Sequence, residues 1–221
     1  MGDFKYKYII RFINAIYWIY LWLKCIFFYG LNTHIGYVLL KKGIVIMKIG
    51  VTEISPRAVQ QHAEKSFKDG YYCCEALMST IRKDFKIDVP EEVIAMASGM
   101  AVGVGKSGCA CGAMNGGVLA LGMLFGRTEQ NGPTNPDSIK CMQLTHELHD
   151  WFRDNNGKHA ICCRILTREF NMGQGEHKEQ CIYFTGLCAW KVATIICREL
   201  GIKNLDEIDE PCARRTIAEI A

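Results

Sequence analysis

A glycine-rich stretch around two cysteines, residues 99–117, constrains the fold of this chain more than any other part of its sequence. It reads GMAVGVGKSGCACGAMNGG and leads directly into the apolar segment 118–126. Glycine tolerates positive φ and lets the backbone approach a bulky object closely, so main chain rather than side chains surrounds the thiols of Cys109 and Cys111. Thiols just before a helix also lie near its free amide groups and the positive end of its dipole, which favours the thiolate. The pattern predicts a loop that holds a metal cluster or a reactive sulfur.

Two short matches within this stretch are similar to nucleotide-binding motifs. Residues 103–108 have the G-x-G-x-x-G spacing, which indicates a dinucleotide site only after a strand in a β-α-β unit, whereas residues 90–97 before them have a helical pattern. Residues 105–107, GKS, also match the last three residues of the phosphate-binding loop motif, but Met100 occupies the position of the first glycine of that motif. We therefore do not expect the chain to bind nucleotides.

The twelve cysteines are unusual for a chain of 221 residues, which is the length of one domain. Several fall in close pairs at 73–74, 109–111 and 162–163, a spacing that suits metal chelation or redox chemistry better than a disulfide framework. No secretory signal with a small-residue cleavage site is recognised. The cysteines therefore predict a reducing compartment, and we expect a cytoplasmic protein.

Charge is divided unevenly along the chain. Residues 1–52 contain seven Lys or Arg and one acidic residue, so they carry +6, whereas the whole chain carries +3 and the remainder therefore −3. This balance does not predict a basic surface, so we expect no nucleic-acid partner.

The apolar segment 9–28 has about the length that crosses a bilayer, although an arginine and a lysine within it weaken that interpretation. Two hypotheses compete. Residues 1–46 are a hydrophobic N-terminal segment that anchors the protein to a membrane, or translation starts at Met47, where the composition changes completely. In both cases we expect residues 47–221 to form the cysteine-rich domain.

From Ser55 onward the sequence predicts one helix after another. Ser55 is an N-cap followed by proline at the first helical position, and Gly70 closes this helix. The segment 114–125 is hydrophobic nearly all round, so we expect this helix to be buried centrally. Further helices are predicted at 71–85, 90–101, 139–153, 159–170 and 179–200, with a short polar helix after Pro211 and one candidate strand at 44–51. The expected fold class is all-α: a compact multi-helix domain with the glycine-rich loop before a buried central helix, preceded by a hydrophobic N-terminal helix.

Four cysteines and their neighbours resemble those of a known family. Cys73 stands in the sequence GYYCCEA, and Cys111 opens the sequence CGAMNG. Cys163 is followed by an arginine, and Cys181 opens the last long helix. This ordered set is similar to the C_GCAxxG_C_C family of redox proteins, which is named for four cysteines in this order around a C-G-A-x-x-G motif. The resemblance covers about residues 56–200.

The resemblance implies a fold, a cofactor and a set of site residues. A related domain occurs in split-Soret cytochrome c, which implies an all-α, homodimeric fold with an iron–sulfur cluster. The chain has no C-x-x-C-H haem-attachment site, so haem is not expected. The implied site consists of four metal ligands and the loop glycines next to the cofactor: Cys73, Cys111, Cys163 and Cys181, with Gly105, Gly108, Gly112 and Gly116.

Several thiols leave the ligand choice open. Cys74, Cys109 and Cys162 each lie beside a family cysteine, and Cys188 follows Cys181 by one heptad. Four thiolates suit a [2Fe–2S] or [4Fe–4S] cluster, and the same four could hold zinc tetrahedrally. They could also form a thiol/disulfide couple in which Cys111 attacks and one of Cys109, Cys73 or Cys163 resolves.

We expect a redox protein that passes electrons to a partner that the sequence does not identify. The alternatives are a thiol/disulfide oxidoreductase and a zinc-stabilised helical interaction module. Membrane association would depend on residues 9–28. His146 and His149 also have a spacing that could bind metal, but a solvated helix face is the favoured interpretation. Cys25 and Cys197 are interpreted as small buried hydrophobic residues.

Overall fold

The computed structural model of the chain describes residues 49–220. Its α-helices are α2 (Pro56–Lys68), α3 (Cys73–Asp84), α4 (Gly112–Phe125), α5 (Pro136–Asn155), α6 (Cys163–Leu166) and α7 (Lys178–Leu200). Three 3₁₀ helices, η1 (Glu91–Met100), η2 (Met172–Gln174) and η3 (Ile217–Glu219), and two short strands, β1 (Glu53–Ile54) and β2 (Lys203–Asn204), complete the described part. The all-α prediction is confirmed. The predicted boundary at 46/47, the apolar segment 9–28 and most of the candidate strand 44–51 lie outside the described residues.

The predicted helix ends follow from their capping residues. The Ser55 side chain accepts a hydrogen bond from the backbone N–H of Ala58, and Pro56 occupies the first position of α2. Asn135 caps α5 in the same way. Gly201 ends α7 with a φ of +66°, the left-handed conformation that glycine adopts without strain.

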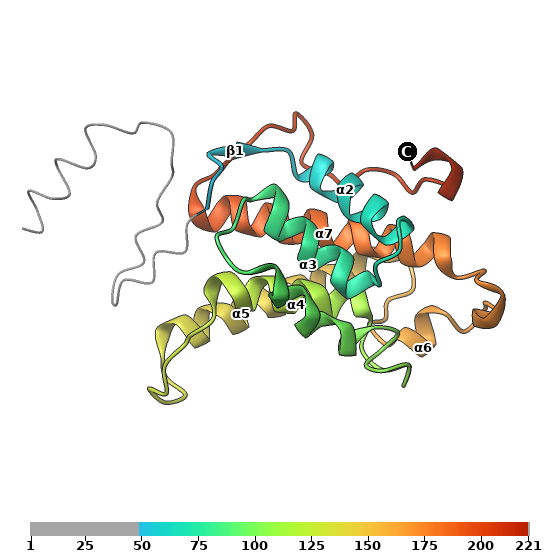
Figure 1. The fold of residues 1–221 in the computed structure, drawn as a ribbon, viewed down its shortest axis with the longest axis horizontal. Helices are drawn as coiled ribbons and strands as arrows, with labels where there is room; N and C mark the ends of the chain where they lie inside the picture. The colour runs from blue at the N-terminus through green and yellow to red at the C-terminus, as the bar shows by residue number, and fades with distance from the viewer. Residues whose placement is uncertain (1–48, 221) are drawn as a thin grey trace, which may run out of the picture. The chain divides into compact units, whose positions relative to one another are not determined.

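The helix α7 forms the centre of the domain (Figure 1). It contacts α2, α3, α4 and α5, so most of its surface is covered by other helices. Among residues 49–220, α7 is long and apolar enough to cross a membrane by length and composition, but 78% of its most apolar window is buried inside the domain. It is therefore explained as the core helix of this domain.

The helix α4 lies between α3, α5 and α7, which confirms the prediction of a buried central helix. Two adjacent glycines allow its neighbours to approach closely. A Cβ at Gly116 would lie 2.8 Å from the carbonyl oxygen of Cys74 on α3, and one at Gly117 would lie 2.6 Å from Cδ2 of Leu148 on α5. Larger side chains here would separate the helices on both sides.

Three predicted helices differ from the structure. Residues 91–100 form the 3₁₀ helix η1 because the buried residues Ile94 and Ala97 recur every third position, which matches three residues per turn. The predicted helix 159–170 shrinks to the single turn α6, because the residues before it pair with the glycine-rich loop. After Pro211 only the short η3 forms.

The strands β1 and β2 were not predicted. They pair in parallel, with Glu53 opposite Lys203 and Ile54 opposite Asn204. Two residues are too few to give an alternating pattern in the sequence.

Candidate functional site

A cavity of about 470 Å³ brings the four family cysteines together. Cys73, Cys111, Cys163 and Cys181 all lie in its wall, although together they span more than one hundred positions of the chain. The sequence therefore selected four residues that the fold places around one space.

The thiols lie at the starts of helices. Cys73 is the first residue of α3, Cys111 is the N-cap of α4, and Cys181 is in the first turn of α7. The amide groups of a first helical turn have no partner within the helix, and the helix dipole makes this end positive. The clearest effect is at Cys111, where the backbone amides of Ala113 and Met114 favour the thiolate against the larger effect of burial.

A short pairing between two loops holds Cys111 beside Cys163. Ala110 and Cys162 form an antiparallel bridge. On either side of it, the backbone N–H of Cys111 donates to the carbonyl oxygen of Ile161 at 2.8 Å, and the N–H of Cys163 donates to that of Cys109 at 2.5 Å. The pairing keeps residues 161 and 162 extended, and α6 starts only after it.

The glycine-rich loop contains a left-handed turn, because the residues from Val102 to Lys106 all have positive φ. Val102 and Val104 are β-branched, and a left-handed conformation costs such residues about 1–2 kcal/mol each. The turn is closely packed: a Cβ on Gly103 would lie 2.5 Å from the backbone nitrogen of Cys109 and 2.8 Å from Cβ of Cys163. The strained turn therefore packs directly against the segment that carries the thiols. A 3₁₀ helix rather than a strand precedes it, so the β-α-β context of a dinucleotide fingerprint is missing here.

The predicted cofactor glycines have different surroundings. Gly112 lies in the cavity wall, and a Cβ there would be 2.2 Å from Sγ of Cys73. Gly116 faces α3, Gly108 lies against the side chain of Arg164, and Gly105 is exposed with no neighbour within 4 Å of a Cβ. Only Gly112 thus borders the cavity, and the contact of the other three with a cofactor stays a prediction.

Cys73 differs electrostatically from the other cavity thiols. A hydrogen bond with the Cys74 side chain lowers the pKa of Cys73, and the backbone N–H of Val102 lowers it further, against the opposing effect of burial. The pKa of Cys74 is correspondingly raised by this hydrogen bond and by burial. Cys73 is therefore the thiol in this cavity that most readily becomes a thiolate.

The other three cavity thiols favour their neutral form in the absence of a cation. Burial raises the pKa of Cys111 and of Cys163, and it raises the pKa of Cys181 to about 12. The negative charge of Cys73 raises all three further, so this sulfur lies electrostatically close to each of the others. A bound cation would reverse this preference, since metal ligation requires deprotonated sulfur.

The spacing of the sulfurs distinguishes between metals. Among residues 49–220, the one group of three potential ligands whose atoms all lie within 4.8 Å of one another is on α5 and contains no cysteine. A tetrahedral zinc ion with bonds of about 2.3 Å would hold its four sulfurs about 3.8 Å apart. No three of the cavity sulfurs lie within 4.8 Å of one another, so they are not arranged as the ligands of a tetrahedral zinc ion in this structure.

The neighbouring thiols do not line the cavity. Cys74 is buried, and its single S–H has two alternative acceptors, the Cys73 sulfur and the carbonyl oxygen of Ala97, which lies 3.0 Å from Sγ, while Cys162 donates to the carbonyl oxygen of Gly108 at 3.2 Å. Cys109 is exposed. Cys188 is buried on α7, and the charges of Cys111 and Cys73 add to the effect of burial in raising its pKa.

The cavity wall also contains residues that sequence reasoning missed. They are aromatic, aliphatic or basic, and most come from segments next to the cysteines: Phe67, Lys68, Tyr71, Tyr72, Met172, His177, Lys178, Ile182 and Ile217. Nδ1 of His177 is buried and has no hydrogen-bond partner. The i, i+4 spacing of His177 and Cys181 could have predicted their common face. Ile217 has no such signal, because it reaches the cavity from the end of the chain.

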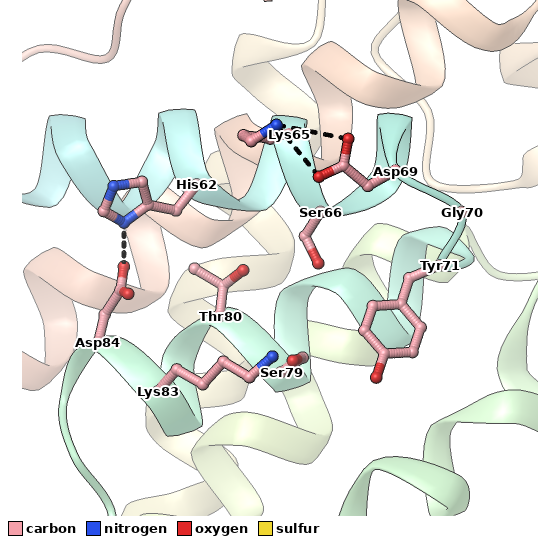
Figure 2. A pocket seen from close by; sticks show the side chains of 10 residues that line it. All are labelled: His62, Lys65, Ser66, Asp69, Gly70, Tyr71, Ser79, Thr80, Lys83 and Asp84. Atoms are coloured by element: carbon pink, nitrogen blue, oxygen red, sulfur yellow. Dashed lines mark hydrogen bonds and ion pairs between the residues drawn. The ribbon is translucent and has the colours of Figure 1, made fainter. Parts of the chain in front are cut away.

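A second hollow, of about 540 Å³, lies between α2 and α3 and contains no cysteine (Figure 2). Its side chains are mainly polar. Two ion pairs cross or border it, His62 with Asp84 at 2.8 Å and Lys65 with Asp69 at 3.2 Å. With His62 and Lys65 paired in this way, it offers less distinctive chemistry than the cysteine cavity.

The fold and the site together define the class of this protein: it is an all-α domain with four cysteine thiols around one cavity. The chain belongs to the C_GCAxxG_C_C family: residues 71–195 match it, and the family is described as "Putative redox-active protein (C_GCAxxG_C_C)". Comparison with curated proteins and with solved structures gave no match.

Proposed function

We propose that Cys73, Cys111, Cys163 and Cys181 hold an iron–sulfur cluster and that the protein transfers electrons to a redox partner. The observation that carries this proposal is the convergence of the four family cysteines on one cavity. Thiolates are the usual protein ligands of such clusters.

The cavity fits such a group in two respects. Its donors are sulfurs, and its volume of about 470 Å³ exceeds what one metal ion needs. No three of the cavity sulfurs lie within 4.8 Å of one another, which favours a multinuclear cluster over a single tetrahedral zinc ion. When bound, the cluster would supply one-electron transfer.

The residues around the cavity would tune this chemistry. The backbone N–H of Val102 donates to the Cys73 sulfur, and the amides of Ala113 and Met114 donate to Cys111. Hydrogen bonds to ligand sulfurs stabilise negative charge and so influence the reduction potential. Tyr71 and Tyr72 belong to the cavity wall and are more than a third exposed.

Metal analysis of protein purified without oxygen tests the proposal. We expect iron and acid-labile sulfide in the wild-type protein, with Cys73→Ser, Cys111→Ser, Cys163→Ser and Cys181→Ser each losing most of both. Cys141→Ser is the matched control, because this half-buried cysteine lies on α5 outside the cavity. Colourless protein with one equivalent of zinc, or four variants that keep their iron, would overturn the proposal.

A thiol/disulfide oxidoreductase is the second candidate, and the lowered pKa of Cys73 favours it. In this reaction the Cys73 thiolate attacks a substrate disulfide, forms a mixed disulfide and releases one substrate thiolate. A second cavity thiol, once deprotonated, attacks the Cys73 sulfur, forms an intramolecular disulfide and releases the other, so two electrons pass to the substrate. The sequence favoured Cys111 as the attacking thiol, but burial raises its pKa.

Alkylation of metal-free protein distinguishes this candidate. A thiol oxidoreductase should show one thiol, Cys73, that reacts with iodoacetamide near neutral pH much faster than the buried thiols. Peptide mass spectrometry identifies the modified residue. Uniformly slow alkylation of the cavity thiols would exclude this candidate.

A further inference from the structure

Three potential metal ligands lie together on α5, on a different element from all four cavity cysteines. His146, His149 and Asp150 occupy positions i, i+3 and i+4, which lie on one face of a helix. One ligand atom from each lies within 4.8 Å of the other two, and this is the one such group of three among the described residues. The sequence drew attention to the two histidines only; the structure adds the carboxylate.

The donor atoms lie close to the distances of a coordination sphere, and the shortest contact, between His149 and Asp150, is a hydrogen bond that a metal ion would replace. Nδ1 of His149 lies 2.8 Å from Oδ1 of Asp150, and Nε2 of His146 lies 3.4 Å from Oδ2. Two donors bonded to the same ion at about 2.1 Å, with an angle of 90–110° between them, are about 3.0–3.4 Å apart. The two imidazole rings are nearly parallel, with an angle of 10° between their planes. Small side-chain rotations would therefore direct all three donors at one ion.

One neighbouring cation competes for this carboxylate. Nη1 of Arg153 lies 3.1 Å from Oδ1 of Asp150, and the same guanidinium also pairs with Asp154. A metal ion must displace Arg153 from Asp150 or share the carboxylate with it. The Asp154 pair gives the guanidinium an alternative partner, so Arg153 can release Asp150 without losing all its ion pairs.

We propose that His146, His149 and Asp150 form a binding site for a divalent late first-row transition-metal ion, such as Zn²⁺ or Ni²⁺, on the surface of α5. Two imidazoles and a carboxylate suit these ions rather than Mg²⁺ or Ca²⁺, which prefer sites made of oxygen alone. Three protein ligands leave the remaining coordination positions of the ion open to water or to another ligand. The site does not depend on whether the cysteine cavity holds a cluster.

Calorimetric titration of the full chain with NiCl₂ tests this proposal. We expect His146→Ala and His149→Ala each to weaken binding at one site by at least about 10-fold, the lower range found when metal-site residues are removed. Both side chains are on the surface, so the fold should be unaffected. Arg153→Gln should tighten binding at the same site, because it removes the competing cation. His62→Ala is the matched control: His62 pairs with Asp84 at 2.8 Å but has no third ligand (Figure 2).

Any nickel that the cavity thiols bind is distinguished from nickel on α5 by absorbance. Nickel bound to thiolate has an intense sulfur-to-metal charge-transfer band in the near ultraviolet, whereas imidazole and carboxylate ligands give none. His149→Ala should therefore lose one equivalent of nickel and retain the full charge-transfer band. Identical stoichiometry and affinity in wild-type, His146→Ala and His149→Ala protein would overturn the proposal, whatever the cavity binds.

Discussion

At the scale of single residues, Gly112 determines how closely α4 approaches the Cys73 sulfur. A Cβ at this position would lie 2.2 Å from Sγ, less than any real contact. The sulfur is at the end of a side chain that can rotate, so the predicted consequence of a larger residue is a displaced ligand rather than an unfolded domain.

Gly112→Ala tests this interpretation. We expect iron content to fall well below the wild-type value while the melting temperature changes little, because alanine favours the helix but forces Cys73 out of place. Gly122→Ala is the control. Gly122 is also in α4 but has open space around its Cβ position, so alanine there should stabilise the protein by about 1 kcal/mol and leave iron unchanged. Full iron content in Gly112→Ala would contradict this account.

The raised pKa of Cys181 predicts that the metal-free protein loses stability at high pH. Its pKa is about 12 in the folded state, against 9.0 for an unperturbed thiol, so the folded state holds its proton longer than the unfolded state. This contribution to stability is complete below pH 9 and is lost as the pH rises toward 12. Each such thiol makes the free energy of unfolding fall by up to about 1.4 kcal/mol per pH unit in this range.

Urea denaturation of metal-free protein at a series of pH values measures this effect. Cys181→Ser should show a shallower decline between pH 9 and 12, because a hydroxyl does not titrate there. Cys109→Ser, which alters an exposed thiol, should leave the slope unchanged. If the free energy of unfolding fell equally steeply with pH in all three proteins, the burial of Cys181 would not be the cause of the decline.

At the scale of elements, the left-handed turn and the loop pairing position the thiols, and two glycines in the turn can be compared directly. Gly103 and Gly105 both have positive φ, but only Gly103 is enclosed by backbone atoms. Gly105→Ala should cost about 1–2 kcal/mol through backbone conformation alone. Gly103→Ala should cost clearly more, because backbone atoms of Gly108 and Cys109 would have to move. Chemical denaturation compares the two variants, and equal costs would contradict the packing described for this turn.

The helices could be predicted from the sequence where local signals decide them. Two helices begin at residues whose side chains cap them, Ser55 and Asn135, and α7 ends at Gly201, which adopts the left-handed conformation. The apolar pattern of α4 likewise indicates that this helix is buried. The extended residues 161 and 162 could not be predicted, because the partner that keeps them extended is the loop around Ala110, some fifty positions earlier. Local propensity therefore failed where a long-range backbone pairing overrides it.

At the scale of the whole molecule, the C-terminal segment after α7 completes the domain although it lies outside the family match. Glu64 on α2 is 1% exposed and pairs with Arg215, and Gln60 exchanges two hydrogen bonds with the backbone of Cys212. The same segment brings Ile217 to the cavity wall. These contacts fix the end of the chain against α2.

Arg215→Ala should destabilise the protein by about 3 kcal/mol, because it leaves the Glu64 carboxylate buried without its cation. The additional change Glu64→Gln should recover much of this loss by removing the charge. Arg214→Ala, an exposed neighbour outside the described ion pairs, serves as the control. Urea denaturation of the four proteins measures the difference, and a cost below about 0.5 kcal/mol for Arg215→Ala would contradict the predicted anchoring.

The four cavity cysteines could be identified from the sequence because the family motif contains them in this order. No local sequence pattern, however, predicts that they line the same cavity. That depends on α3, α4 and α7 starting at the same end of the bundle and on α6 being held there by the loop pairing. The rest of the wall, such as Met172 and Ile217, comes from segments without a motif. Dimerisation, the redox partner, membrane association and cytoplasmic location stay predictions.

X-ray absorption at the iron edge of protein purified without oxygen tests the central claim most directly. The account predicts iron surrounded by sulfur with a short iron–iron distance, and loss of this signal in Cys111→Ser but not in Cys141→Ser. Protein without iron, or iron coordinated by nitrogen and oxygen without a second iron nearby, would contradict it.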